Sequence, residues 1–371
     1  LRQRGIGAAA HDPMWQLGSA PPGGRALLDH LRGLGFDDQV MLDAGVVVPR
    51  TTTGDLRDRW INRLMFPIHD LEQQVIGFTG RDMSDGSNDR IPKWLNSGTT
   101  DLFAKSKVLY GLGPQLAQSI PDGATVQVAV VEGPADVIAT HAAYAGLQAE
   151  GTFTIAAAPC GTAFTADQFG VLASTLGQQE AKLLVAFDSD KAGAKAFDRA
   201  YEMLRTWPGP TAGLSALPTK DIADLVGRDG IESALLTLLA AERPLPLLAI
   251  EHRLGQMTAQ GFDPAIPEHA AAAYTALSEF VFQSADTKHS MLAVDLISEQ
   301  LRLPVNQVVD GVTTAYEQKH QLFEQDQPGP APPVKVAASA FAIGATGVQN
   351  PAGPVQHDAE TPVRVAARAS R

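Results

Sequence analysis

The 371-residue sequence contains a single cysteine, Cys160. With one cysteine, no disulfide can form within the chain, and no zinc site can be built from cysteine ligands. Proteins of oxidising compartments commonly carry disulfides, so this composition favours a reduced, cytoplasmic location. Cys160 itself, in the stretch APCGTA, is expected to be a small buried residue and not a nucleophile.

Long apolar runs and nucleotide-binding P-loops are also missing. The most apolar stretch, residues 234–250, is interrupted by Glu242, Arg243 and two prolines, so it is not expected to span a membrane. The sequence shows no secretory signal peptide. No Gly-x-x-x-x-Gly-Lys-Ser/Thr motif occurs, which excludes a P-loop ATPase or a fused helicase of that class within this chain. We therefore expect no membrane partner.

Positive charge is scarce overall but locally concentrated. The formal net charge is −12, from 29 basic and 41 acidic residues, which argues against a uniformly basic nucleic-acid binder. Between residues 90 and 107, however, four basic residues are opposed by one acid; they are Arg90, Lys93, Lys105 and Lys107, and the acid is Asp101. A local basic patch of this kind can still attract a polyanion.

Hydrophobic periodicity divides the chain into regions. Buried strands alternate with helices after residue 119, as in VQVAVV, GPADVIATHAAYAG and TFTIAAAP, which indicates an α/β fold with a parallel, helix-covered sheet. Earlier residues mix short helices with two strands joined by the polar turn HDLEQQ, and residues beyond 229 show helical patterns of a bundle. The last segment is rich in Pro, Ala and Gly and is expected to be a disordered tail or linker. The predicted parts are 1–118, 119–228, 229–325 and 326–371.

Acidic residues follow successive predicted strands. Glu132 follows the first strand of the parallel sheet, Asp188 and Asp190 follow the third, and Asp221 follows the fourth, which is predicted at GLSALP (residues 213–218). Because the carboxyl ends of parallel strands meet at one edge, these side chains should converge, and Asp136 lies one helical turn after Glu132. Carboxylates without His or Cys suit Mg²⁺ or Mn²⁺, and such a site suits two-metal phosphoryl transfer. Taken singly, each acid is better explained as a loop residue or helix N-cap, and it is their joint placement at strand ends that favours the metal site.

The ordered set of these motifs resembles the TOPRIM domain. The carriers of the resemblance are VVEGPADVIATHAAYAG, APCGTAFT and AFDSDKAGAKAF. The resemblance implies a catalytic glutamate at Glu132 and a metal-binding Asp-x-Asp pair at Asp188 and Asp190. It also implies that Asp221 is a metal ligand and that two or more Mg²⁺ or Mn²⁺ ions are bound.

The upstream stretch resembles the N-terminal half of the catalytic core of DnaG-type primases. The matching residues are Arg63, Phe66-Pro67-Ile68, Val75 to Phe78, Gly80-Arg81, Pro92 to Ser97, Phe103 to Lys105 and Leu109 to Leu112. The resemblance runs from about residue 1 to about residue 230. It implies that residues 1–118 are a nucleotide- and template-contacting subdomain, and it places the contacting positions at Arg81, Lys93, Trp94, Asn96 and Lys105, with Arg63 as an auxiliary candidate.

Basic residues beside an aromatic ring are also what a single-strand groove uses, because a base can stack on the ring. Lys93 and Trp94 fit this description. The alternative is a solvated basic loop with Trp94 in a local core.

The sequence departs from the family pattern in two places. The N-terminal zinc-binding domain of DnaG-type primases is not found and the first segment of the core looks clipped, so we expect a fragment without structural zinc. The last acidic motif of the family is Asp-x-Asp, but here Asp221 is followed by Ala223, with Asp224 one position later. Asp224 is therefore an auxiliary candidate for the second acid, and Asp136 is an auxiliary candidate beside Glu132.

The function that this reading favours is DNA primase. Such an enzyme makes short RNA primers on single-stranded DNA from NTPs by metal-dependent nucleotidyl transfer, with release of pyrophosphate. The expected partners are a single-stranded DNA template, NTPs and a replicative helicase. The alternatives are a non-catalytic TOPRIM module of a plasmid or phage replication protein that binds single-stranded DNA, or a TOPRIM nuclease.

Overall fold

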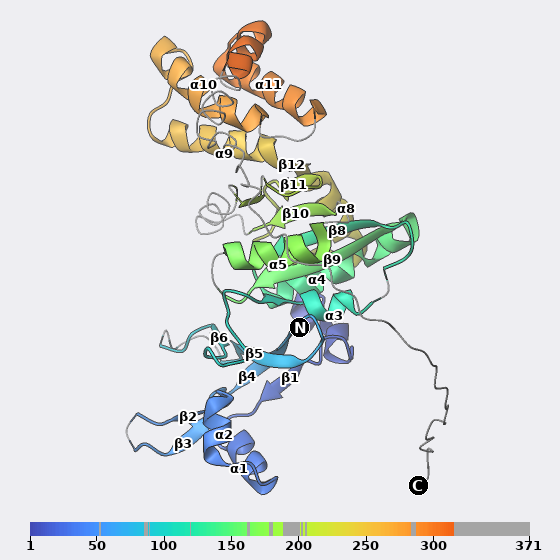
Figure 1. The fold of residues 1–371 in the computed structure, drawn as a ribbon, viewed down its shortest axis with the longest axis vertical. Helices are drawn as coiled ribbons and strands as arrows, with labels where there is room; N and C mark the ends of the chain where they lie inside the picture. The colour runs from blue at the N-terminus through green and yellow to red at the C-terminus, as the bar shows by residue number, and fades with distance from the viewer. Residues whose placement is uncertain are drawn as a thin grey trace, which may run out of the picture. The chain divides into compact units, whose positions relative to one another are not determined.

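The computed structural model describes residues 1–314 apart from 52, 85–87, 89, 119, 162–163, 178–180, 188–200, 202, 205 and 283–286. Residues Leu1–Gln321 form one compact unit, drawn as a ribbon in Figure 1. Within the described residues, no helix is long and apolar enough to cross a membrane.

An antiparallel sheet forms the first half of this unit. Its strands run in the order β1-β4-β5-β6, and their bounds are Gly18–Ala20, Arg63–His69, Val75–Asp82 and Trp94–Asn96. The predicted pair of strands with a polar turn is confirmed as the β4–β5 hairpin. Its turn is closed by the Asp70 carboxylate, which accepts the Gln74 N–H at 2.7 Å, and by Gln73, which adopts φ +67°. Two short 3₁₀ helices precede the sheet, η1 (Arg2–Arg4) and η2 (Gly7–Ala10).

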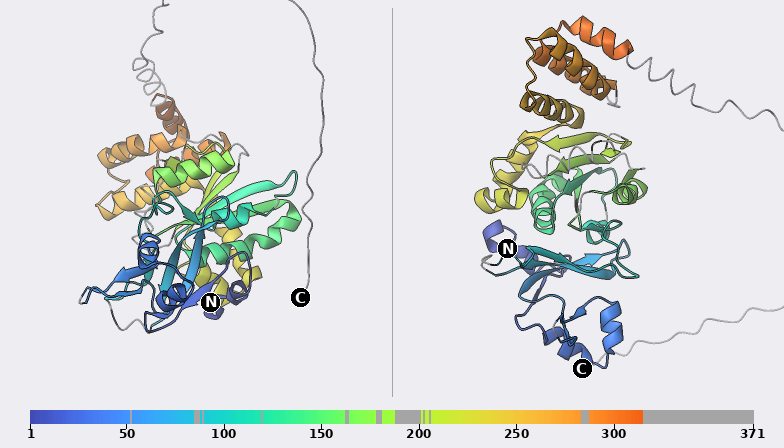
Figure 2. Two further views of the ribbon diagram at one scale, coloured as in Figure 1. Left: turned by 60° about the horizontal axis from the view of Figure 1, so that its bottom comes forward. Right: turned by 90° about the vertical axis from the view of Figure 1, so that its left-hand side faces the viewer.

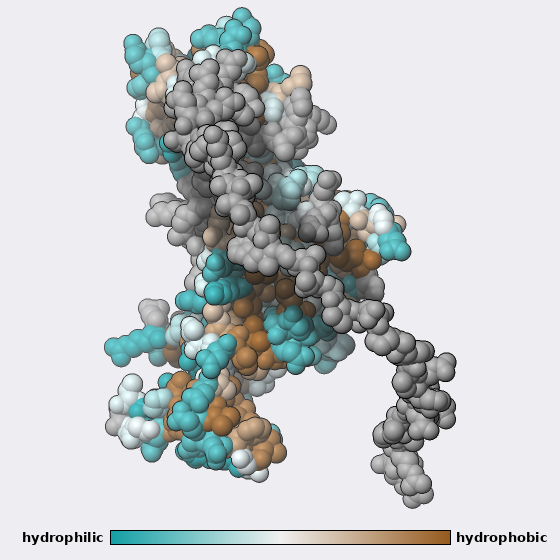
Figure 3. All heavy atoms as spheres, in the orientation of Figure 1, coloured by the Kyte–Doolittle hydropathy of each residue, from teal (hydrophilic) through white to brown (hydrophobic). Residues whose placement is uncertain are grey.

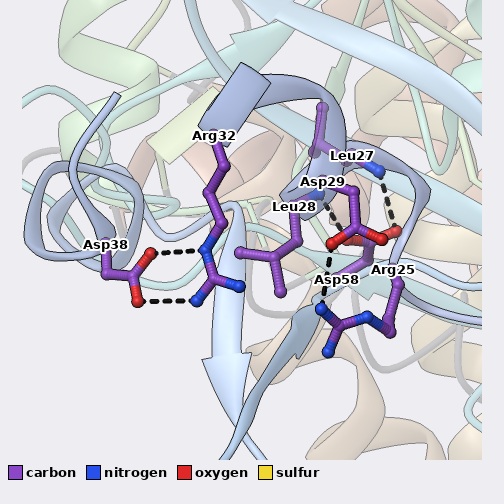
Figure 4. Close-up of polar contacts among 7 residues, drawn as sticks. All are labelled: Arg25, Leu27, Leu28, Asp29, Arg32, Asp38 and Asp58. Carbon is purple, nitrogen blue, oxygen red and sulfur yellow. Dashed lines mark hydrogen bonds and ion pairs between the residues drawn. The ribbon is translucent and has the colours of Figure 1, made fainter. Parts of the chain in front are cut away.

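A small lobe is inserted between β1 and β4. It contains α1 (Ala26–Gly33), α2 (Asp38–Asp43), β2 (Val47–Pro49) and β3 (Leu56–Asp58). Figure 4 shows the buried carboxylate of Asp58 accepting the backbone N–H groups of Leu27 and Leu28 at 3.1 and 2.8 Å, where α1 begins. This carboxylate satisfies two of the donors that a helix start leaves unpaired.

The two helices of this lobe are tied by a two-pronged ion pair. Both oxygens of Asp38 accept from the Arg32 guanidinium, at 2.8 and 2.7 Å (Figure 4). Apolar side chains remain exposed at this end, namely Leu34, Phe36 and Val40. Brown surface is correspondingly visible over the lobe in Figure 3.

A second, mainly parallel sheet forms the centre of the unit. Its strands run in the order β12-β11-β10-β8-β9-β7, and the bounds in chain order are β7 (Leu109–Tyr110), β8 (Thr125–Val131), β9 (Thr152–Pro159), β10 (Lys182–Ala186), β11 (Thr211–Leu214) and β12 (Glu242–Pro244). The four middle strands are parallel, and the two edge strands are antiparallel to their neighbours. This confirms the predicted α/β fold class with a parallel sheet.

Helices cover both faces of this sheet, as Figure 2 shows. The helices and 3₁₀ turn of this region are α3 (Leu112–Leu116), α4 (Pro134–Tyr144), η3 (Ala145–Glu150), α5 (Ala166–Leu176), α7 (Ile222–Asp229) and α8 (Ile231–Ala241). Because side chains alternate along a strand, Ala129 and Val131 of β8 join the core under α4, α7 and α8, whereas Val128 and Val130 join the core under α5. The sheet is therefore buried on both faces, as parallel sheets are.

The helical run that the sequence predicts from residue 229 is interrupted by β12. This strand pairs with β11, and its Glu242 accepts from the Tyr144 hydroxyl at 3.0 Å and forms an ion pair with Lys182. Pro244 explains the interruption, because the residue before a proline is biased away from helical geometry. A layer of helices follows, α9 (Leu245–Ala259), α10 (Pro267–Phe282) and α11 (Thr287–Leu301), with its own apolar core.

Candidate active site

Two helices begin next to each other at the carboxyl edge of the parallel sheet. Helix α4 follows β8 and helix α7 follows β11. The buried Asp136, in the first turn of α4, accepts the backbone N–H of Ala223, in the first turn of α7, at 3.1 Å. The partial positive ends of two helices therefore meet here, an arrangement that favours anions.

Asp221 is the N-cap of α7. Its Oδ1 accepts the Asp224 N–H at 2.7 Å, and the same oxygen accepts from Nη1 of Arg4 at 2.8 Å. Nε of Arg4 lies 3.2 Å from Oδ1 of Asp224. Burial alone would lower the pKa of Arg4, but the hydrogen bond and the charge of Asp221 outweigh it, and the pKa is raised.

Cations from the antiparallel sheet face these carboxylates. Arg81, near the end of β5, has a lowered pKa because it is partly buried and because Arg4 is close. The pKa of Lys93 is lowered by burial first and then by the charges of Arg81, Lys220 and Arg4. We call these four residues the cationic cluster. Arg4 and Arg81 are half-buried and Lys93 and Lys220 are exposed, and cations gathered in this way favour the arrival of a polyanion.

Trp94 and Asn96 lie on the face of β6 toward this cluster, and the structure gives each a partner. The guanidinium carbon of Arg81 is 5.3 Å from the centre of the Trp94 ring, and the Phe66 ring is 5.4 Å away. The Asn96 amide donates to the carbonyl of Cys160, which follows β9, at 2.7 Å. The two sheets are thus linked at the site by a direct hydrogen bond.

Arg63 and Lys105 differ in setting from the cationic cluster. The buried Arg63 donates to the carbonyls of Gly80 and Pro92 at 2.9 and 2.8 Å, so it holds the segment before β6 against β5. Lys105 is exposed, and its backbone carbonyl accepts from the Gln168 side chain at 3.0 Å. The roles predicted for these residues, and for Trp94 and Asn96, in contacting nucleotide or template stay predictions.

Glu132 directly follows β8 and precedes the N-cap of α4. Strands β8 and β10 are in register at Val131 and Ala186, so the chain leaves both strands at the same level of the sheet. The predicted ligands Asp188 and Asp190 follow β10 but lie outside the described residues. Among the residues that are described, no group of three acidic, histidine or cysteine side chains is arranged to hold a metal ion. The carboxylates that follow β8 and β10 in sequence are nevertheless hard oxygen donors, which fit Mg²⁺ or Mn²⁺.

Sequence reasoning missed Arg4 and Lys220. Arg4 is 217 positions away from its partner Asp221, and no local pattern announces such a contact. Lys220 directly precedes Asp221, which the sequence already indicated as a candidate ligand, so the position of Lys220 was a usable signal.

Two family descriptions match successive parts of the chain. Residues 1–115 match the family described as DNA primase catalytic core, N-terminal domain. Residues 129–225 match the Toprim-like family. The first match ends within α3, and the second begins within β8.

Known proteins resemble the chain in sequence and in structure. A DNA primase of Streptomyces coelicolor is 35% identical over 274 residues, which are 74% of this chain and 39% of that protein. The crystal structure of a DNA primase domain from Pseudomonas aeruginosa matches with a TM-score of 0.61 at 30% identity, covering 84% of this chain and 90% of that domain. A DnaG primase catalytic domain bound to single-stranded DNA matches with a TM-score of 0.61 at 26% identity, covering 83% and 89%. The chain spans well under two thirds of the Streptomyces relative, but it covers nearly all of the matched catalytic domains, and it therefore belongs to the DnaG-type primase family.

Proposed function

We propose that this chain is the RNA-polymerising core of a DNA primase. It joins ribonucleotides on a single-stranded DNA template: the 3′-hydroxyl oxygen of one nucleotide attacks the α-phosphorus of the next NTP, and pyrophosphate leaves. The observation that supports this most directly is the convergence of Arg4, Arg81, Lys93 and Lys220 beside the starts of α4 and α7. A triphosphate is a polyanion of the kind that several neighbouring arginines and lysines can bind and orient.

The roles of the side chains follow from their placement. Glu132, with Asp188 and Asp190, would hold Mg²⁺ or Mn²⁺ at the sheet edge; when bound, the metal supplies charge stabilisation for the attacking and leaving oxygens. The cationic cluster binds and orients the triphosphate. Trp94 and Lys93 contribute to the path of the template, as does the exposed Lys105, and a related domain has been seen with single-stranded DNA bound. A replicative helicase as partner and a cytoplasmic location are further parts of this proposal.

The domain assignment is part of the proposal too. We assign residues 1–118 to nucleotide and template contacts and residues 119–228 to the acidic residues. Residues 229–325 and 326–371 are given no part in the chemistry. The mixed composition of the site supports this division, since Arg81 and Lys93 come from the first part and Asp136 and Asp221 from the second.

The direct test is primer synthesis. The protein is incubated with single-stranded DNA, labelled NTPs and Mg²⁺ or Mn²⁺, and the products are resolved by length. We expect RNA products of a few to some tens of nucleotides that depend on template and metal. If product stays at the level of an Asp188→Ala variant while single-stranded DNA is still bound, the protein is a binding module; if the template is cut instead, it is a nuclease.

A substitution of Lys93 is expected to have opposite effects on binding and on stability. Lys93→Ala removes one cation, so the slope of log K for single-stranded DNA against log salt should become shallower by about 0.7. The lowered pKa of Lys93 means that its charge is unfavourable in the folded, ligand-free protein, so the variant should melt at the same or a slightly higher temperature.

Fluorescence anisotropy at several salt concentrations and thermal melting measure the two effects. The exposed Arg253 of α9 supplies the control, because Arg253→Ala removes a cation outside the cluster and should leave the salt slope unchanged. A slope in Lys93→Ala equal to that of wild type would remove Lys93 from the template path.

A further inference from the structure

The segment that carries Arg4 sits on α7 through a direct backbone contact. Gly227 lies within α7, and a Cβ atom added there would be 2.4 Å from the carbonyl oxygen of Gln3 and 2.9 Å from Cα of Arg4. On the other side, Gly5 adopts φ +66°, and a Cβ on it would be 2.8 Å from the carbonyl oxygen of Val226. Each glycine therefore leaves room for the backbone of the opposite segment.

A glycine inside a helix needs a reason, because it costs about 1 kcal/mol relative to alanine. Gly170 in α5 offers a comparison, since a Cβ there would meet nothing within 4 Å. At Gly227 the opposing atoms belong to backbone, which cannot rotate aside as a side chain can. The reason for glycine at 227 is thus the close approach of η1.

This close approach determines where the Arg4 side chain begins. From there, its Nη1 lies 2.8 Å from Asp221 and its Nε lies 3.2 Å from Asp224, so two carboxylates contact different nitrogens of the planar guanidinium. The carboxylates also offset the repulsion between Arg4 and the neighbouring Arg81. Without them, Arg4 would be driven out of the cationic cluster when no nucleotide is bound.

We propose that the close backbone approach of the Gln3–Gly5 segment to Val226 and Gly227 of α7 sets the position of the Arg4 guanidinium in the nucleotide site, and that Asp221 and Asp224 are positioning residues that act through Arg4. This inference rests on the proposed function, because it takes the cationic cluster as the triphosphate site. It assigns the last acidic motif, where Ala223 replaces the family's second aspartate, to holding an arginine. The metal is left to Glu132, Asp188 and Asp190.

The test compares nucleotide affinity in four proteins: wild type, Gly227→Ala, Arg4→Gln and the double variant. With MANT-ATP and Mg²⁺ as the probe, we expect the dissociation constant to rise about tenfold in Gly227→Ala, because small misplacements of a binding group are costly. In the Arg4→Gln background the same glycine substitution should change it less than twofold, because the group that it displaces is gone. Gly170→Ala, the matched control, should bind like wild type.

An unchanged dissociation constant in Gly227→Ala, or an equal rise in the Arg4→Gln background, would overturn the proposal. Asp224→Asn provides a second reading that does not depend on the tight glycine contact. It should weaken MANT-ATP binding severalfold while the Mg²⁺ concentration for half-maximal primer synthesis stays as in wild type, and a shift in that concentration would make Asp224 a metal ligand instead. Primer synthesis by the wild type in the same preparation tests the proposed function separately, because the comparison of MANT-ATP dissociation constants does not require primer synthesis.

Discussion

Glu132→Gln is expected to abolish primer synthesis, with a loss of about a thousandfold or more. Glutamine has the shape of glutamate but neither its charge nor its second metal-binding oxygen. Glu132 stands where β8 gives way to α4, level with the end of β10, after which Asp188 and Asp190 follow. The affinity for a divalent ion depends on the charge of its ligands, so the two remaining carboxylates should bind it more weakly than three.

The measurement is incorporation of labelled NTPs on a single-stranded template over a range of Mg²⁺ and Mn²⁺ concentrations. Binding of single-stranded DNA should stay within twofold of wild type, because the template path is assigned to basic and aromatic residues. Glu72→Gln, in the exposed turn between β4 and β5, is the matched control and should keep full activity. Retention of more than about a tenth of wild-type activity in Glu132→Gln would show that Glu132 is not a required ligand.

The parallel sheet was predictable because its signal is local. Strands such as VQVAVV are buried on both faces and read as continuous apolar runs, and helices with clear stops separate them. The β4–β5 hairpin was predictable for the same reason, since its turn residues lie beside each other in sequence. The end of the fourth parallel strand was misplaced: the pattern GLSALP suggested residues 213–218, whereas β11 covers Thr211–Leu214, paired with β10 and β12.

The partners of the acidic residues were not predictable, because they depend on tertiary contacts. Asp136 was predicted as an additional acid for a metal, which stays a prediction, but the sequence did not indicate that it accepts the N–H of Ala223 from another helix. Asp221 was predicted as a metal ligand, with a helix N-cap as the alternative; the metal role stays a prediction, and the sequence did not indicate the ion pair with Arg4 from the first residues of the chain. Only the glycine at position 227 hinted that another backbone approaches α7, and a single glycine does not say which one.

Gln115 of α3 illustrates the same limit within the core. Strand β7 pairs with β9 only at Leu109 and Tyr110, after which the chain turns into α3. The next backbone groups of β9 that face this side belong to Ala156, and the fully buried Gln115 pairs with both. Its Oε1 accepts the Ala156 N–H at 2.9 Å, and its Nε2 donates to the Ala156 carbonyl at 2.6 Å. The side-chain amide therefore takes the place of the strand residue that would have come next.

Further partners fill the remaining capacity of this amide. Nε2 also donates to the Gly111 carbonyl at 2.7 Å, and Nδ1 of His141 in α4 lies 3.1 Å from Oε1. Burial lowers the pKa of His141, so at neutral pH the ring is uncharged and its hydrogen bond to Gln115 joins two neutral groups. Gly111 and Ala156 are buried, so their backbone groups depend on partners such as Gln115, and His141 is half-buried.

Gln115→Leu is therefore expected to lower the free energy of unfolding by about 3 kcal/mol, since leucine has a similar size but leaves the N–H and C=O of Ala156 without partners. Chemical denaturation followed by circular dichroism gives this value from the shift of the midpoint at unchanged slope. Gln118→Leu, at a half-exposed position just beyond α3 where the side-chain amide donates to the sulfur of Met14 at 3.0 Å, should cost far less. If both variants lose the same free energy of unfolding, the loss comes from placing leucine in or near α3. The hydrogen bonds between the Gln115 amide and β9 would then contribute little to stability.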